Sequence, residues 1–245
     1  MLFAFTSEES GRVRAEKGLK GFCPDCSAEM VPKCGQIMTP HWAHKTLRDC
    51  DTWSEGETEW HRGWKGEFPD DEIEVRLNKD GKRHIADVKL ASPIGKIEVI
   101  EFQHSSISPE EIEARERFYG KNEMLWMFDA IQAYKSRRFW FEDANKSIDG
   151  KKIKTTDWKH GKKSLLACDA TVVLDLGKAE PTERNPLPEH WLFRVISMGT
   201  YWKESEWDGQ TSTSERMVLT GYFRTREKFL RTFSVKHRNN GNVHT

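Results

Sequence analysis

This chain of 245 residues has no net charge, no apolar run long enough to cross a membrane, no internal repeat and no low-complexity segment. Its 39 Lys and Arg residues balance 39 Asp and Glu residues, so bulk charge does not indicate a nucleic-acid partner. No apolar stretch approaches the ~20 residues that span a bilayer. The N-terminal MLFAFTSEESGRVR is too short in apolar residues for a secretory signal. We therefore expect a cytoplasmic protein without a membrane partner.

Charge is nevertheless unevenly distributed along the chain. Basic residues gather in three segments, 135–138, 150–163 and 224–238. Such a pattern fits a nuclease that avoids coating itself with DNA, and it also fits ordinary solvated faces. Arg137 and Arg138, in the first of these segments, are candidate nucleic-acid contacts. The sequence gives no indication of the oligomeric state.

Cysteine is scarce, but four of the five cysteines lie between residues 23 and 50. In a cytosolic protein this crowding favours metal binding over disulfides. Structural Zn²⁺ takes four thiolate or imidazole ligands in a tetrahedron. We predict that these ligands are Cys23, Cys26, His44 and Cys50, with His41 as a substitute for either of the last two.

The remaining cysteines have simpler interpretations. Cys34 lies in a Cys-Gly turn and is a spare residue in this scheme, while Cys168 lies in an apolar segment and is expected to be a buried hydrophobe. The alternative for the whole N-terminal segment is a reduced, metal-free module whose two histidines pack on Trp42.

A helix is predicted from Ser54 to about residue 67. Ser54 and Glu57 match the capping-box pattern, with Ser54 as the N-cap and Glu57 at the third helical position. Glu57, His61 and Trp64 then share one face of the helix. Proline and two aspartates at 69–71 end it.

Strands and a second helix follow. Three strands are predicted at 73–77, 83–90 and 96–103, the first two joined by a tight turn at 78–81. A helix capped by Ser108 runs to Tyr119, and its length suits a crossover that returns the strand at 124–128 parallel to the third strand. This last strand is wholly apolar and should lie in the middle of a sheet. The order is helix, three antiparallel strands, helix, strand, which is an α/β (α+β) fold.

The C-terminal segment 136–245 reads as an extension of the same domain. The pattern predicts strands at Leu165–Leu176 and Trp191–Ser197 and an amphipathic helix at Ser214–Phe233. It also predicts a loop at 180–190 and a disordered tail from about 238. The predicted domains are thus 1–53, 54–135 and 136–245.

Acidic side chains interrupt the predicted strands. Asp87 lies in the middle of one strand, and Glu101 and Gln103 lie two residues apart on the next, where alternation puts both on one face. Carboxylates on an apolar scaffold are costly unless they bind a cation or transfer protons. Converging carboxylates hold the Mg²⁺ or Mn²⁺ that assists phosphodiester cleavage, and Glu57 and His61 could complete such a site. The alternative is half-exposed residues on a wet sheet face.

Five motifs occur in the order typical of one family. These are CPDC, PHWAHK, GETEWHRGWK, RHIADV and IEFQHSSISPEEIEARERFY. Together they resemble the competence protein CoiA-like nuclease family over roughly residues 20–130. That family falls within the restriction-endonuclease-like PD-(D/E)xK superfamily. The resemblance implies a core of Asp87, Glu101 and Gln103, with His61 as an added ligand. This chain has Gln103 where the superfamily usually has lysine.

The function expected from these features is a metal-dependent deoxyribonuclease with an N-terminal zinc module. One Mg²⁺ or Mn²⁺ would be held by Asp87, Glu101, the Phe102 carbonyl and His61, while Gln103 would orient the attacking water. Lys65 would contact phosphate or be a solvated helix residue. DNA uptake, recombination or phage DNA processing would use such an enzyme. The alternatives are a DNA-binding accessory protein without robust cleavage and a zinc-dependent protein-interaction module.

Overall fold

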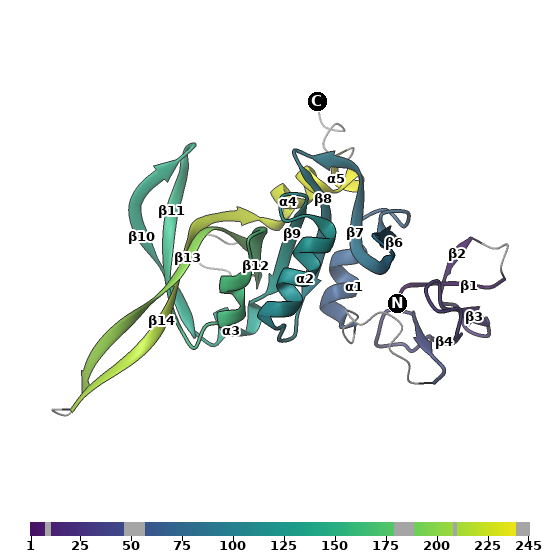
Figure 1. Cartoon of the computed structure of the whole chain (residues 1–245), viewed down its shortest axis with the longest axis horizontal. Helices are drawn as coiled ribbons and strands as arrows, with labels where there is room; N and C mark the ends of the chain where they lie inside the picture. The colour runs from purple at the N-terminus through teal and green to yellow at the C-terminus, as the bar shows by residue number, and fades with distance from the viewer. Residues whose placement is uncertain (8–10, 47–56, 179–188, 208–209, 239–245) are drawn as a thin grey trace. The chain divides into compact units, whose positions relative to one another are not determined.

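The structure is a computed structural model, and it describes residues 1–7, 11–46, 57–178, 189–207 and 210–238. It is a mixed α+β structure made mostly of sheet (Figure 1). The chain divides into two compact units, Met1–Ala91 and Ser92–Thr245, which are described separately below. The domain boundaries expected near residues 53 and 135 stay predictions. Within the described ranges, no helix is long and apolar enough to cross a bilayer.

The first unit begins with a small antiparallel sheet in the order β2-β1-β3-β4-β5. Its strands are β1 (Phe3–Phe5), β2 (Arg12–Arg14), β3 (Gly21–Phe22), β4 (Glu29–Lys33) and β5 (His41–His44). Trp42 fills the core of this sheet, and its Nε1 donates to the Val13 carbonyl at 3.0 Å. A Cβ added at Gly21 would lie 2.7 Å from the Trp42 ring, so glycine is what allows the indole to lie against this strand.

A helix and a hairpin complete the first unit: α1 (Glu59–Lys65), β6 (Ile73–Lys79) and β7 (Lys82–Ile94). The N-cap of α1 is Thr58, whose hydroxyl accepts from the His61 N–H while the His61 ring accepts from the Thr58 N–H. The helix therefore begins four residues later than predicted, and Glu57 precedes it. The predicted N-cap, Ser54, lies outside the described residues. The β6–β7 turn is as predicted, because Asp80 and Gly81 both adopt positive φ, as a tight hairpin turn requires.

The second unit contains a sheet in the order β10-β11-β14-β13-β12-β9-β8. Its strands are β8 (Ile97–Gln103), β9 (Met124–Asp129), β10 (Phe139–Ile148), β11 (Lys151–Lys159), β12 (Thr171–Lys178), β13 (His190–Trp207) and β14 (Gln210–Thr225). Strands β8, β9 and β12 are parallel, whereas the strands from β12 to β10 pair antiparallel. In Figure 1, β13 and β14 form a long two-stranded ribbon.

In the described part of this unit, five short helices accompany the sheet: α2 (Pro109–Tyr119), α3 (Ile131–Lys135), the 3-10 helix η1 (Lys163–Ala167), α4 (Arg226–Phe233) and α5 (Val235–Arg238). The predicted cap of α2 is confirmed, since the Ser108 hydroxyl accepts from the Glu111 N–H at 3.1 Å. The predicted crossover is confirmed as well, because α2 connects β8 to β9 and these strands are parallel. Strand β9 is central and buried, as its apolar sequence predicted.

The C-terminal half departs from the sequence-based expectations. The segment expected as one strand at 165–176 is η1 followed by β12, and the helix expected at 214–233 is mostly strand β14 followed by α4. Pairing along the whole of β13 overrides the helical pattern of β14. Strand β13 is also longer than the predicted Trp191–Ser197.

Two strands of this half were not predicted, and parts of the predicted loop and tail lie outside the described residues. Strands β10 and β11 were not predicted, because their charged residues gave no clear alternation. Residues 180–188 of the predicted loop and 239–245 of the predicted tail lie outside the described residues.

The Glu116 carboxylate fixes α2 to the sheet. It accepts from Trp126 Nε1 on β9 and from the backbone N–H groups of Asp169 and Ala170, each at 3.0 Å. On the other face of β9, Leu125 lines a small cavity together with Phe229 of α4. Helices α2 and α4 therefore cover opposite faces of the sheet, because neighbouring strand residues alternate sides.

We expect Glu116→Ala to lower the free energy of unfolding by roughly 3 kcal/mol, because it leaves three N–H donors, two of them buried, without their acceptor. Glu113→Ala is the matched control, since Glu113 is an exposed residue of the same helix and its loss should cost less than about 0.5 kcal/mol. Urea unfolding of both variants measures the difference. Equal stability of the two variants would contradict the role of Glu116.

Candidate functional site

Lys65, the last residue of α1, lies among three carboxylates of the first unit. Its Nζ is 2.8 Å from Asp87 Oδ1, 2.9 Å from Glu57 Oε1 and 3.3 Å from Glu74 Oε1. Burial opposes the charged form of Lys65, but the three carboxylates together raise its pKa well above the ordinary value. The side chain is therefore a buried ammonium ion, with only 6% of the residue exposed. The expectation of a solvated lysine is therefore wrong, and a phosphate contact by Lys65 stays a prediction.

Two of these carboxylates also bind the N-terminal strand. Glu57 Oε2 lies 2.9 Å from the Met1 amino group. Burial alone would raise the pKa of Glu57, but the charges of Lys65 and the Met1 amine lower it well below its ordinary value. The Glu74 carboxylate accepts from the Leu2 N–H at 2.8 Å. Sequence analysis missed Glu74, although the alternation of Glu72 and Glu74 with apolar residues would have placed both acids on one face of β6.

Asp87 and His61, two of the predicted ligands, both lie in this unit. Asp87 occupies the middle of β7, and its side chain is 18% exposed. His61 is buried on α1, with Nδ1 2.9 Å from the Thr58 hydroxyl. Because Nδ1 takes part in the helix cap, a ligand role would fall to the other ring nitrogen, Nε2.

Glu101 and Gln103 lie on β8 in the second unit, two positions apart and therefore on one face. Both are buried, as is Phe102 between them, so the alternative of a half-exposed residue on a wet sheet face is wrong for Glu101. Asp87, whose side chain is 18% exposed, still fits that alternative. Glu101 Oε2 is 3.2 Å from Arg115 Nη1 of α2. The Gln103 Nε2 donates to the Ser105 carbonyl at 3.3 Å.

The oxygen of the Gln103 carboxamide is the unusual atom of this face. Gln103 is 0% exposed, and its Oε1 has no hydrogen-bond partner in the part of the chain that the structure describes. Buried polar atoms nearly always have a partner.

Asp87 belongs to the first unit and Glu101 and Gln103 to the second, and their sharing of one divalent ion stays a prediction.

Arg137 and Arg138 follow α3. Arg137 adopts a positive φ of 54°, and the Arg138 N–H donates to the Ala133 carbonyl at 3.0 Å, which together close the end of the helix. Both arginines line a hollow of about 480 Å³, together with Trp140, Lys159, His160 and Arg216. The described lining has four cations and no carboxylate, so it attracts anions.

Three of the predicted zinc ligands come together in the N-terminal sheet. The ligand atoms of Cys23, Cys26 and His44 all lie within 4.8 Å of one another, and Cys26 Sγ is 3.4 Å from His44 Nε2. Ligands around a tetrahedral zinc are roughly 3.5 Å apart at normal Zn–S and Zn–N bond lengths. The group therefore fits one bound metal ion such as zinc.

The turn at 23–28 shapes the thiol half of this group. The Cys23 carbonyl accepts from the Ser27 N–H at 3.0 Å, the Cys23 N–H donates to Ala28, and Ser27 adopts a positive φ. The Asp25 N–H lies 3.4 Å from the Cys23 sulfur. An N–H directed at sulfur favours the thiolate, which is the form that binds metal.

The other candidate ligands differ from this trio. His41 is on the opposite face of β5 from His44, and its Nδ1 lies 2.9 Å from the Thr39 carbonyl oxygen. It is not part of the group, contrary to its expected role as substitute. Cys34 packs against the core around Trp42. Cys50 lies outside the described residues, so its place as fourth ligand stays a prediction.

The three candidate metal ligands fall within a segment that matches a family model. Residues 5–52 match the family model of the competence protein CoiA, N-terminal domain. The resemblance to CoiA is thereby supported for this segment, which contains CPDC and PHWAHK; the other three motifs lie beyond it. No match was found to curated proteins or to solved structures. A relationship to the PD-(D/E)xK superfamily stays a prediction.

Metal analysis tests the trio in this CoiA-like segment. We expect about one zinc per purified chain, as in four-ligand structural sites. Cys23→Ser should release the metal and unfold the segment, because metal binding supplies folding energy in such small modules. Cys34→Ser is the matched control and should keep its zinc. Equal zinc content in the two variants would exclude the proposed ligands.

The buried ammonium ion is tested by Lys65→Met, which keeps the length of the side chain and removes its charge. Three carboxylates would then lose their shared cation, and we expect the free energy of unfolding to fall by about 3–5 kcal/mol. Lys79→Met, at an exposed position of β6, should change it by less than about 0.5 kcal/mol. Chemical denaturation gives both values, and a Lys65 variant as stable as the control would refute this account.

Proposed function

We propose that this protein is a metal-dependent nuclease that cleaves DNA phosphodiester bonds, with a role related to competence. The observation that carries the proposal is the fully buried Gln103 carboxamide, whose oxygen lacks a partner among the described residues, two positions from Glu101 on β8. A buried group of this kind is costly unless a ligand, water or ion uses it. The match to CoiA over residues 5–52 supports a competence-related role.

Each of the proposed site residues would have the role that its chemical group allows. Asp87 and Glu101 supply carboxylate oxygens, the ligand type that Mg²⁺ and Mn²⁺ prefer, while the Phe102 carbonyl and His61 are the further candidate ligands. When bound, such an ion stabilises negative charge on the phosphate and activates water. Gln103 would orient that water but supplies no charge. Lys65, 2.8 Å from Asp87, holds a fixed positive charge beside one of the proposed ligands.

A second candidate function is DNA binding without robust cleavage. It is favoured by the fact that each proposed carboxylate ligand already has a cationic partner, Lys65 for Asp87 and Arg115 for Glu101. A divalent ion would have to compete with these ion pairs. The zinc-dependent interaction module expected from the sequence is a third reading, and it predicts neither cleavage nor DNA binding.

Relaxation of supercoiled plasmid in Mg²⁺, in Mn²⁺ and without added divalent ion tests the nuclease. We expect ion-dependent nicking that Asp87→Asn lowers at least about 100-fold, because a ligand worth several kcal/mol to the transition state is lost. Asp80→Asn is the control, since it removes the same charge from the β6–β7 turn, where asparagine tolerates the positive φ. Gln103→Ala should slow cleavage, whereas Gln103→Lys should keep or increase it.

The outcomes separate the candidates. Cleavage by Asp87→Asn at the parental rate would place the metal centre elsewhere. A parent protein that binds DNA but nicks with neither ion is the accessory protein, and one that does neither is the interaction module.

A further inference from the structure

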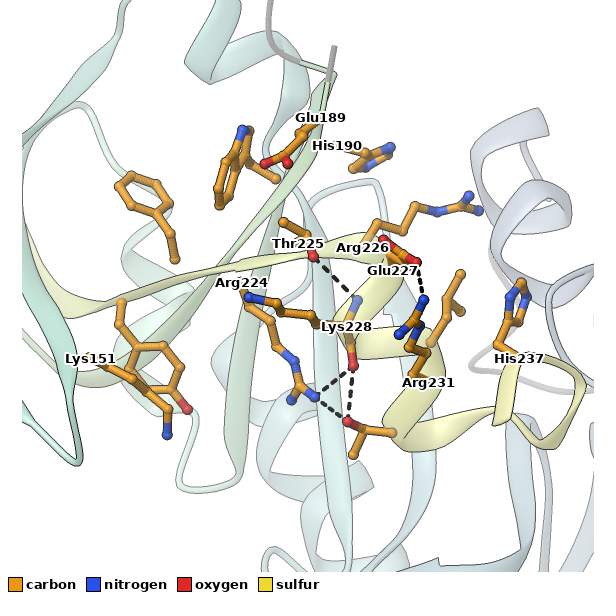
Figure 2. Close-up of a pocket in the computed structure, with 15 residues that line it drawn as sticks. Lys151, Glu189, His190, Arg224, Thr225, Arg226, Glu227, Lys228, Arg231 and His237 are labelled. Atoms are coloured by element: carbon orange, nitrogen blue, oxygen red, sulfur yellow. Dashed lines mark hydrogen bonds and ion pairs between the residues drawn. The ribbon is translucent and has the colours of Figure 1, made fainter. Parts of the chain in front are cut away.

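A large basic hollow lies between β14 and α4 of the second unit (Figure 2). Its volume is about 1110 Å³, which exceeds the roughly 300–1,000 Å³ typical of small-ligand pockets. Among the described residues, five cations line it, Lys151, Arg224, Arg226, Lys228 and Arg231, against two carboxylates, Glu189 and Glu227. The size and the excess of positive charge suit an extended anion.

Contacts with α4 hold two of these arginines, Arg224 and Arg231, in position. Figure 2 shows Glu227 paired with Arg231, at 2.6 Å, and Arg224 donating to the Lys228 carbonyl at 2.7 Å. The Thr225 hydroxyl caps the helix by accepting from the Lys228 N–H. The hollow thus has one arginine held against the helix backbone, while the Lys151 and Lys228 side chains are exposed.

Aromatic rings line the same hollow. Trp191, Tyr222 and Phe223 line it, and each of these residues is half-buried. The strand register places Tyr222 and Arg224 on the α4 side of the β13–β14 pair, and Trp191 and Phe223 on the other side. The Lys151 ammonium lies 4.7 Å from the centre of the Tyr222 ring, and Trp191 meets Phe223 edge-on at 5.9 Å. Cations beside accessible aromatic rings are the two parts of a surface that binds single-stranded nucleic acid, where rings stack on bases and cations contact phosphates.

We propose that the hollow between β14 and α4 binds single-stranded nucleic acid. The inference rests on the proposed action on nucleic acid and narrows the substrate to single strands. A duplex offers its phosphates to the cations but keeps its bases stacked within the helix, away from the Tyr222 ring. An acidic protein would use the charge and leave the rings without a stacking partner.

Fluorescence anisotropy with labelled oligothymidylate and oligouridylate, without added divalent ion, tests the charge. We expect Lys151→Glu/Lys228→Glu to weaken binding at least about 10-fold and to lower the salt slope by roughly 1.4, at about 0.7 per lost phosphate contact. The control is Lys79→Glu/Lys96→Glu, which makes the same charge change at exposed residues outside the hollow and should bind like the parent. Equal binding by the two double variants overturns the proposal.

The stacking part needs its own variants. Tyr222→Ala should weaken binding roughly 5- to 100-fold, while Tyr222→Phe, which keeps a ring, should bind within a few-fold of the parent. Unlabelled duplex and polyglutamate serve as competitors. Competition by either that matches unlabelled single strand overturns the proposal, as does unchanged binding by Tyr222→Ala. The relative affinities for the two labelled probes distinguish DNA from RNA.

This experiment is independent of cleavage. A parent that binds single strands through the hollow but never nicks plasmid refutes the nuclease and leaves the binding site in place. A parent that nicks plasmid, with hollow variants that bind single strands as the parent does, supports the nuclease and refutes the binding site.

Discussion

The first unit depends on one buried positive charge, the ammonium group of Lys65. It neutralises Glu57, Glu74 and Asp87, which come from the segment before α1, from β6 and from β7. Three carboxylates at this depth repel one another and lose their hydration, so they are tolerated only with a cation between them. Glu57 and Glu74 in turn bind the first residues of the chain. Helix, hairpin and N-terminal strand are therefore held by a single electrostatic arrangement.

The second unit also pairs its buried charged groups with specific partners. Glu116 satisfies three N–H groups under α2, and Arg115 pairs with Glu101 beside it. Among the described residues of this sheet, Gln103 Oε1 and Trp158 Nε1 are buried without a hydrogen-bond partner. The Gln103 oxygen directs attention to β8, because it lies two positions from Glu101.

The candidate functional sites differ in whether their charged groups already have partners of opposite charge. The zinc candidates Cys23, Cys26 and His44 lie in the segment that matches the CoiA N-terminal domain, where a bound metal would supplement a core built around one tryptophan. The carboxylates of the proposed nuclease are already paired with cations. The hollow beside α4 is different, because its cations outnumber its carboxylates and aromatic rings lie among them.

The sequence by itself determined the features that depend on local chemistry. Cys23 and Cys26 indicated a metal knuckle, Asp80 and Gly81 a hairpin turn, and Ser108 the start of α2, because spacing, φ preference and capping act over a few residues. The apolar run of β9 likewise predicted a central strand.

Tertiary structure decided what depends on distant partners. The burial of Lys65 requires Glu74, which no local pattern links to it. Strand β14 looks helical until it pairs with β13. The basic, aromatic hollow joins β11, β13, β14 and the helices after them. Pairing and burial energies arise between segments far apart in the chain, so single-sequence periodicity does not contain them.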